Sequence, residues 1–123
     1  SEPQASAPNR QDLAYGRIYQ FMNEVYFEIV SKLNKRVRTT KTYWNKIIQK
    51  HASVEHCEKE IKQTLKEPDF IRLSSKDASV YLYYREFKIY YLCVVVRHLN
   101  GAGYIITAYF TSNMKIGRQI WKK

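Results

Sequence analysis

The sequence predicts an α+β domain in which N-terminal helices pack on one face of a four-stranded antiparallel β-sheet and leave the opposite face open. Three observations predict this class. Apolar residues recur at three- and four-residue spacing in the first half of the chain. They alternate with polar residues from residue 70 onward. The chain has 123 residues, which is the size of one domain, and its 45% of hydrophobic residues suffices for a small core.

The N-terminal third is expected to be helical after a short polar start. Residues 1–10 are mostly small and polar and contain proline, and we interpret them as a flexible linker or an expression remnant, followed by a single domain over residues 11–123. A first helix is predicted over residues 11–33, because apolar side chains form one stripe at helical spacing: Tyr15, Ile18, Met22, Val25, Ile29 and Leu33. Residues 34–41 are expected to form a basic connector.

Two shorter helices are predicted next. A helix over residues 42–51 places four side chains on one face: Trp44, Ile47, Ile48 and His51. Ser53 is a suitable N-cap for a third helix, which Pro68 ends. Seven lysines and arginines and no acidic residue lie between residues 31 and 50. Such a run is usually a solvated surface, but its lack of compensating charge favours anion binding.

The second half of the chain predicts an antiparallel meander. Its strands are expected at residues 70–73, 79–85, 88–98 and 104–111, with turns at residues 75–77 and 100–101. Residues 112–123 are expected to form either a short final strand or a loop that closes the open face. The strand over residues 104–111 should alternate, with Ile105, Thr107, Tyr109 and Thr111 on one face and Ile106, Ala108 and Phe110 on the other.

The final third of the chain is strongly basic. After Glu86 there is no acidic residue, whereas six cationic residues follow: Lys88, Arg97, Lys115, Arg118, Lys122 and Lys123. The formal net charge is +10, and the chain has eleven tyrosines, most of which are expected to be half-buried strand residues. Charge and aromatic content together favour nucleic acid as the partner, with an anionic membrane surface or an acidic protein as alternatives.

Several other classes of protein are disfavoured. Cys57 and Cys93 give no disulfide framework and are interpreted as small core residues. These cysteines, His51 and His56 lack the spacing of zinc-ligand pairs, so neither a metal nor a cofactor is expected. No apolar run approaches the roughly 18–20 residues that span a bilayer. The sequence also has no glycine-rich phosphate loop and no nucleophile elbow.

The residues do supply what RNA cleavage needs. RNA can be cut by its own 2′-hydroxyl, if the enzyme moves a proton from that hydroxyl, stabilises the charge on the phosphate and protonates the leaving oxygen. A histidine can carry the proton, arginines can clamp phosphate, and strand hydroxyls can position it. The expected catalytic residues are His51, Arg85, Arg97, Thr107 and Tyr109. The expected substrate-binding residues are Lys50, Lys115, Thr111 and Trp44.

These residues also have structural interpretations. His51 ends a helix, where a positive charge suits the helix dipole. Arg85 could pair with Glu86. Arg97 needs a partner or a ligand, because it ends a long apolar strand, and the sequence places few acidic residues nearby. Trp44 fits the core better than a stacking platform.

Five short segments follow one another within residues 43–121: Lys50-His51 on a helix, PDFIR at 68–72, VYLYYR at 80–85, YLCVVVR at 91–97 and GYIITAY at 103–109. In this order they resemble the phage and polymorphic-toxin branch of the barnase–EndoU–colicin–RelE ribonuclease superfamily. The resemblance implies helices on a four-stranded antiparallel sheet, metal-independent ribonuclease activity on the open face, and neutralisation by a cognate immunity protein. It points to His51, to Arg85 or Arg97, and to Thr107 with Tyr109. Lys115 is a weaker match.

The position of His51 sets a geometric condition. If its helix packs under the sheet, the side chain must reach around an edge to join the open face. If it does not reach, Tyr109 or His98 must take its role. His98 is expected to be exposed at the mouth of a hairpin.

The leading hypothesis is a metal-independent endoribonuclease toxin domain that cleaves RNA, tRNA among the targets, to a 2′,3′-cyclic phosphate. It would act in the cytoplasm, delivered as the C-terminal part of a larger secreted or phage-encoded toxin. An acidic immunity protein or antitoxin would be its partner, and no membrane is involved. The alternatives are a non-catalytic module that binds RNA or DNA, and an interaction protein whose basic face docks an acidic partner.

Overall fold

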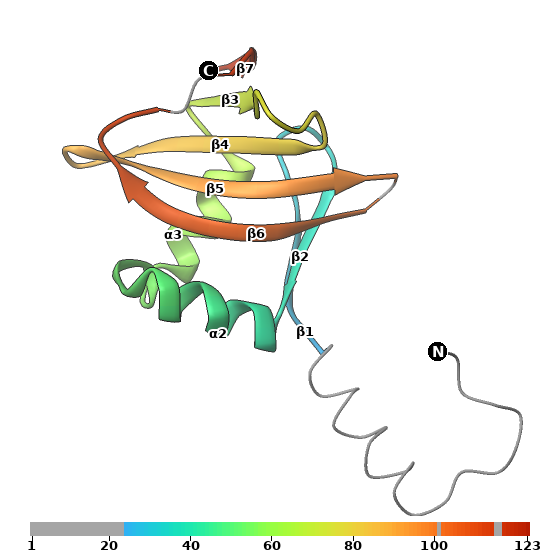
Figure 1. The fold of residues 1–123 in the computed structure, drawn as a ribbon, viewed down its shortest axis with the longest axis vertical. Coiled ribbons are helices and arrows are strands. Elements are labelled where there is room, and N and C mark those ends of the chain that lie inside the picture. The colour runs from blue at the N-terminus through green and yellow to red at the C-terminus, as the bar shows by residue number, and fades with distance from the viewer. Residues whose placement is uncertain (1–23, 101, 115–116) are drawn as a thin grey trace, which may run out of the picture.

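The computed structural model describes residues 24–100, 102–114 and 117–123. They form one seven-stranded sheet in the order β1-β2-β6-β5-β4-β3-β7, with two α-helices (Figure 1). The strands are β1 (Val25–Val30), β2 (Arg36–Thr40), β3 (Phe70–Leu73), β4 (Val80–Phe87), β5 (Tyr90–Leu99), β6 (Ala102–Thr111) and β7 (Gln119–Lys122). The helices are α2 (Lys41–Lys50) and α3 (Glu58–Lys66), with the 3₁₀ helix η1 (Ala52–Val54) between them. The predicted four-stranded sheet is wrong, because β1, β2 and β7 widen it.

The predicted first helix is also wrong where the structure describes it. Residues 25–30 form β1, and residues 11–23 lie outside the described part of the chain. The strand has the sequence VYFEIV, in which every residue except the glutamate is β-branched or aromatic. Such residues favour strands, and β1 pairs antiparallel with β2, so strand propensity and pairing override the helical spacing.

The segment predicted as a basic connector forms β2. Val37 and Thr39 are buried, with 0% and 1% of their surfaces exposed, whereas Arg36 and Arg38 are exposed. This is a period-two pattern hidden in a charged segment. β2 also pairs in parallel with β6, where Val37 lies opposite Gly103. Pairing between segments so far apart in the chain leaves no local sequence signal.

The predicted elements between residues 41 and 111 agree better with the structure. Thr40 caps α2 and accepts a hydrogen bond from the Tyr43 amide at 3.1 Å. α3 begins at Glu58 rather than after Ser53, because residues 52–54 form η1. It ends two residues before Pro68, as expected. β3 has its predicted bounds, and those of β4, β5 and β6 lie within two residues of the prediction. The C-terminal tail forms β7, the first of its two expected outcomes.

The two faces of the sheet carry separate buried clusters. On the helix-covered face, side chains of α2 and α3 pack on the central strands, and the largest contributors include Trp44, Ile47, Ile61, Leu65, Tyr83, Leu92, Val94 and Val96. On the opposite face, six strand residues form a second buried cluster, to which α2 and α3 contribute no residue: Phe70, Val80, Leu82, Tyr84, Cys93 and Val95. The face predicted to be open therefore has a core of its own.

A β-bulge between β5 and β6 breaks the predicted alternation. Val95 pairs with Thr107 and Val96 with Ile105, so Ile106 has no direct partner in the ladder. Ile105 therefore turns to the helix-covered face and is fully buried, while Ile106 packs against the cluster of the opposite face. Thr107 lies beyond the bulge and keeps its predicted orientation.

Candidate functional site

The candidate site lies where the end of α2 meets the outer edge of β6. Within the described residues, β2 pairs with β6 only at Gly103 and Tyr104. Beyond Tyr104, β2 no longer pairs with this edge of β6, and α2 and η1 both contact β6. His51 is the C-cap of α2, and its amide donates to the Ile47 carbonyl at 2.8 Å. The helix therefore delivers a histidine to the edge of the sheet.

His51 lies against Tyr109. Their ring centroids are 5.6 Å apart, and the ring planes make an angle of 35°. Tyr109 packs against the cluster of the opposite face, whereas α2 packs on the helix-covered face. The histidine thus reaches around the edge of β6, which meets the geometric condition set by the sequence.

The surroundings of His51 lower its pKa. Partial burial disfavours the charged ring, and the positive charge of Lys50 acts in the same direction. The imidazole is therefore mainly neutral at neutral pH and can accept a proton. Lys50 itself is exposed at the last residue of α2 and places a cation beside the histidine.

Tyr109 and Thr107 supply two hydroxyls on the same face. Burial raises the pKa of Tyr109 well above its ordinary value, with contributions from the Cys93 thiol and from Tyr84, so its hydroxyl keeps its proton at neutral pH and has the capacity to donate. The buried Thr107 hydroxyl has no hydrogen-bond partner among the described residues. Buried polar groups are normally paired, so a polar ligand could complete the environment of Thr107.

Arg97 lies on this face but already has protein partners. In the strand register, Arg97 lies opposite Tyr104 on β6. It is two residues along β5 from Val95, which lies opposite Thr107. Its Nη1 donates to Asp77 and to Ser79, each at 2.9 Å. Hydrogen bonds from the amide and hydroxyl of Ser79, followed by that from Arg97, lower the pKa of Asp77 to about 2. The structure thus shows the partner that the sequence could not identify.

Arg85 does not join the site. Along β4 it has the same orientation as Tyr83, toward the helix-covered face, and it lies opposite Leu92. Its Nη1 donates to the Glu67 carbonyl beyond the end of α3. Arg85, expected as a catalytic residue, therefore lies away from Thr107, because the parity of β4 turns it to the helix-covered face.

The remaining expected substrate contacts are dispersed. Trp44 is 7% exposed and packs on Tyr26 and Phe27, so it belongs to the core. Thr111 ends β6, where its hydroxyl donates to the Asn113 carbonyl at 2.6 Å. Lys115 lies outside the described residues.

His98 is buried, not exposed at a hairpin mouth as expected. Its side chain faces the helix-covered side, with 7% of the residue exposed, and its Nε2 lies 2.9 Å from the Tyr83 hydroxyl. The Tyr83 hydroxyl donates its proton to Ser31 Oγ at 2.9 Å. His98 therefore cannot replace His51 beside Tyr109. The sequence holds no signal for this, because Ser31 and Tyr83 come from distant segments.

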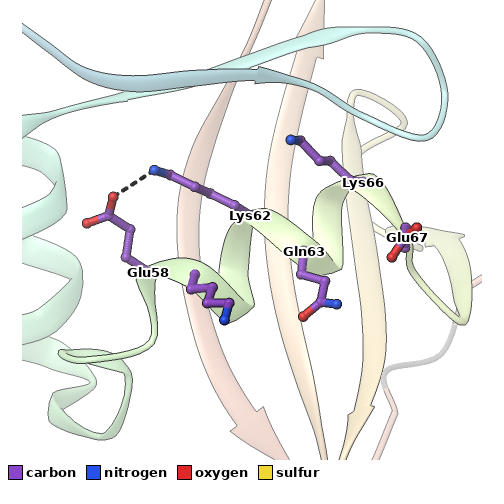
Figure 2. Close-up of a pocket in the computed structure, with 6 residues that line it drawn as sticks. Glu58, Lys62, Gln63, Lys66 and Glu67 are labelled. Carbon is purple, nitrogen blue, oxygen red and sulfur yellow. Dashed lines mark ion pairs between the residues drawn. The ribbon is translucent and has the colours of Figure 1, made fainter.

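A depression of about 680 Å³ runs along α3, and His51 is not among the residues that line it (Figure 2). Figure 2 shows Lys62 and Lys66 on one side of the helix and Gln63 on the other. Lys62 forms an ion pair with Glu58 at 2.8 Å, and its Nζ lies 4.7 Å from the centroid of the Phe27 ring. The lining comes from α3 and the residue after it, so we interpret this depression as solvated helix surface.

Comparisons with known proteins found no match for this chain among family models, curated proteins or solved structures. Among the described residues, no three His, Cys, Asp or Glu side chains are grouped as metal ligands would be. In the same part of the chain, no helix is long and apolar enough to cross a membrane.

Proposed function

We propose that this protein is an endoribonuclease that cleaves RNA without a metal ion, with His51 as the proton carrier. The observation that carries the proposal is the contact between the rings of His51 and Tyr109, 5.6 Å apart, on a face that also holds the unpartnered Thr107 hydroxyl. A neutral imidazole beside two hydroxyls matches the chemistry of RNA cleavage, in which the substrate provides its own nucleophile.

The proposed reaction uses one proton carrier in two steps. His51 takes the proton from a 2′-hydroxyl, and the 2′-oxygen attacks the adjacent phosphorus. The bond between phosphorus and the 5′-oxygen breaks, which gives a 2′,3′-cyclic phosphate. The imidazolium then returns its proton to the leaving 5′-oxygen, so the ring is neutral again at the end of the reaction.

Charge that develops on the phosphate needs donors and cations. The hydroxyls of Tyr109 and Thr107 are buried, and they would donate to a phosphate oxygen if the bound strand exposes them. Lys50 adds a positive charge from the end of α2. Arg97 would contribute if a phosphate displaced Asp77, its present partner.

The proposal extends to the partner and the place of action. The net charge of +10 supports RNA as the substrate and an acidic immunity protein as the inhibitor. In line with the resemblance of its motifs, the domain would act in the cytoplasm of a target cell as the C-terminal part of a larger toxin.

Replacement of His51 tests the proposal directly. Labelled RNA is incubated with the protein in EDTA, and the products are assayed for cyclic phosphate ends. Loss of a general acid or base typically costs roughly 100- to 10,000-fold in rate, and we expect a loss of this size in His51→Ala. His56→Ala is the matched control, because His56 is exposed in the turn before α3. Full activity of His51→Ala, or intact RNA with the wild-type protein at high concentration, would refute the proposal.

A second candidate is a module that binds RNA or DNA without cutting it. It is favoured by the positions of the two arginines, since Arg97 is held by Asp77 and Arg85 faces the helices. In this case the wild-type protein would leave RNA intact, and His51→Ala would bind it with unchanged affinity.

A further inference from the structure

A cavity of about 600 Å³ opens on the opposite face of the sheet, beside β3 and β7. Its walls include aromatic side chains (Phe70 and Tyr91), acidic ones (Asp69 and Glu86) and basic ones (Arg72, Lys122 and Lys123), together with Met114 and Gln119. The volume lies in the range of small-ligand sites, roughly 300–1,000 Å³. The proposed reaction uses none of these residues.

Aromatic rings form one wall of the cavity. The Phe70 and Tyr91 centroids are 5.6 Å apart with their planes at 70°, and Tyr84 stacks on Phe70 with the centroids 5.0 Å apart. The guanidinium carbon of Arg72 lies 5.4 Å from the Phe70 centroid. Tyr91 is only half-buried and so presents part of its ring. Single-stranded bases stack on aromatic rings and on guanidinium planes, so this wall suits a base.

Two carboxylates line the cavity of a strongly basic protein. Asp69 accepts a hydrogen bond from the Glu86 amide at 2.6 Å, and its other oxygen lies 3.8 Å from the Lys123 ammonium. The exposed Glu86 carboxylate forms no hydrogen bond or ion pair within residues 24–100, 102–114 and 117–123. A carboxylate repels phosphate but accepts hydrogen bonds from the amino groups of adenine, cytosine and guanine. Uracil has no amino group.

The register of the strands connects this cavity with the candidate site. Tyr109 lies opposite Cys93, Cys93 opposite Tyr84, and Tyr84 opposite Phe70. These residues form one row across the opposite face. Three strand spacings separate its ends, which is about 14 Å. A few nucleotides of an extended single strand can cover that distance.

We propose that this cavity is a nucleobase subsite that holds an amino-bearing base of a single-stranded nucleic acid. The inference rests on the proposed function in one respect, that the bound strand is the substrate whose phosphate lies at His51. Tyr91 and Arg72 stack the base, and Glu86 accepts a hydrogen bond from its amino group. Lys122, at the end of the row beside Phe70, holds a neighbouring phosphate.

The test uses oligonucleotides that cannot be cut. Fluorescently labelled oligodeoxycytidine and oligodeoxyuridine of equal length lack the 2′-hydroxyl, and their bases differ in the amino group that cytosine has and uracil lacks. Binding is measured by anisotropy. The wild-type protein should prefer the cytosine oligomer, and Glu86→Gln should abolish that preference. Loss of one stacking partner typically weakens binding by roughly tenfold, which we expect for both oligomers in Tyr91→Ala.

Matched variants make the result specific. Tyr90→Ala removes the adjacent tyrosine, whose side chain has the opposite parity along β5, and should leave binding unchanged. Glu28→Gln removes an exposed carboxylate on β1 and should keep the preference for cytosine. Tyr91→Leu preserves apolar packing against Phe70 and replaces Tyr91→Ala if the alanine variant does not fold.

The outcomes separate this inference from the proposed function. Equal affinity of the wild-type protein for both oligomers, or equal binding by the Tyr91 and Tyr90 variants, would overturn the subsite even if RNA is cleaved in a His51-dependent way. A preference for cytosine that Glu86→Gln removes would support the subsite even if RNA is left intact.

Discussion

A buried chain of hydrogen bonds runs from His98 through Tyr83 to Ser31. Tyr83 donates to Ser31, so it can accept from a proton on Nε2 of His98. The other ring nitrogen faces Gly103, where a Cβ atom would come within 2.6 Å of it, so glycine is required at this position of β6, opposite His98 on β5. Burial lowers the pKa of His98 to about 4, and the charge of Lys35 acts in the same direction. Protonation of this ring therefore works against the folded state.

At the residue scale, we expect the free energy of unfolding to fall as the pH drops from 6.5 to about 4. Between these values the unfolded chain binds a proton at His98 and the folded protein does not, so stability rises with pH and is complete above 6.5. A shift of this size corresponds to a contribution of about 3 kcal/mol. Urea denaturation at a series of pH values measures it.

The variant His98→Gln isolates this contribution from other titrating groups. It should show a smaller loss of stability toward acid than the wild-type protein, while His56→Gln should show the full loss, because His56 is exposed. Parallel pH profiles for His98→Gln and the wild-type protein would show that His98 does not titrate as described.

Among the elements, the hairpin of β4 and β5 has an unfavourable turn. Phe87 pairs with Tyr90, so Lys88 and Ile89 form a two-residue loop, and Lys88 has a φ of 58°. Hairpins with a positive φ at the first loop position favour glycine there. We expect Lys88→Gly to raise the free energy of unfolding by about 0.5–1 kcal/mol, as measured by chemical denaturation.

The neighbouring position provides the control for this prediction. Ile89 does not have a positive φ, so Ile89→Gly adds chain entropy without relieving strain and should not stabilise the protein. If both glycine variants behave alike, the backbone of Lys88 is not the source of the effect.

Local signals account for the elements that the sequence predicts well. Thr40 and the apolar face of α2 define a helix, and the alternation of residues 70–73 defines a strand. β1 and β2 were missed because helical spacing and charge masked their strand character. In the candidate site, the sequence pointed to His51 and Tyr109 as separate residues, and the structure brings their rings together. The ion pair of Arg97 with Asp77 was not, because it depends on how the loop before β4 folds over β5.

For the molecule as a whole, charge predicts a strong dependence of RNA binding on salt. Lysines and arginines that contact phosphates release bound counterions, and the net charge of +10 supports several such contacts. If about five phosphates are neutralised, the logarithm of the association constant should fall with the logarithm of the salt concentration with a slope of about −3.5. Titrations of the His51→Ala protein with single-stranded RNA at several salt concentrations measure this slope without cleavage.

A flat salt dependence would mean that the basic residues serve another partner. The matched comparison is Lys50→Gln, which removes the cation beside His51 and should make the slope shallower by about 0.7. Lys76→Gln, in the exposed turn before β4, should leave the slope unchanged.

The parallel pairing of β2 with β6 also joins two strands that are made at different times. A ribosome makes β2 long before β6, yet Val37 and Arg38 find their partners only when residues 103 and 104 have emerged. Until then β2 is an unprotected strand edge on a nascent chain, and such edges invite association with other chains. This ladder thus joins a strand made early in synthesis to one made much later, and β2 is open to pairing with other chains during that interval.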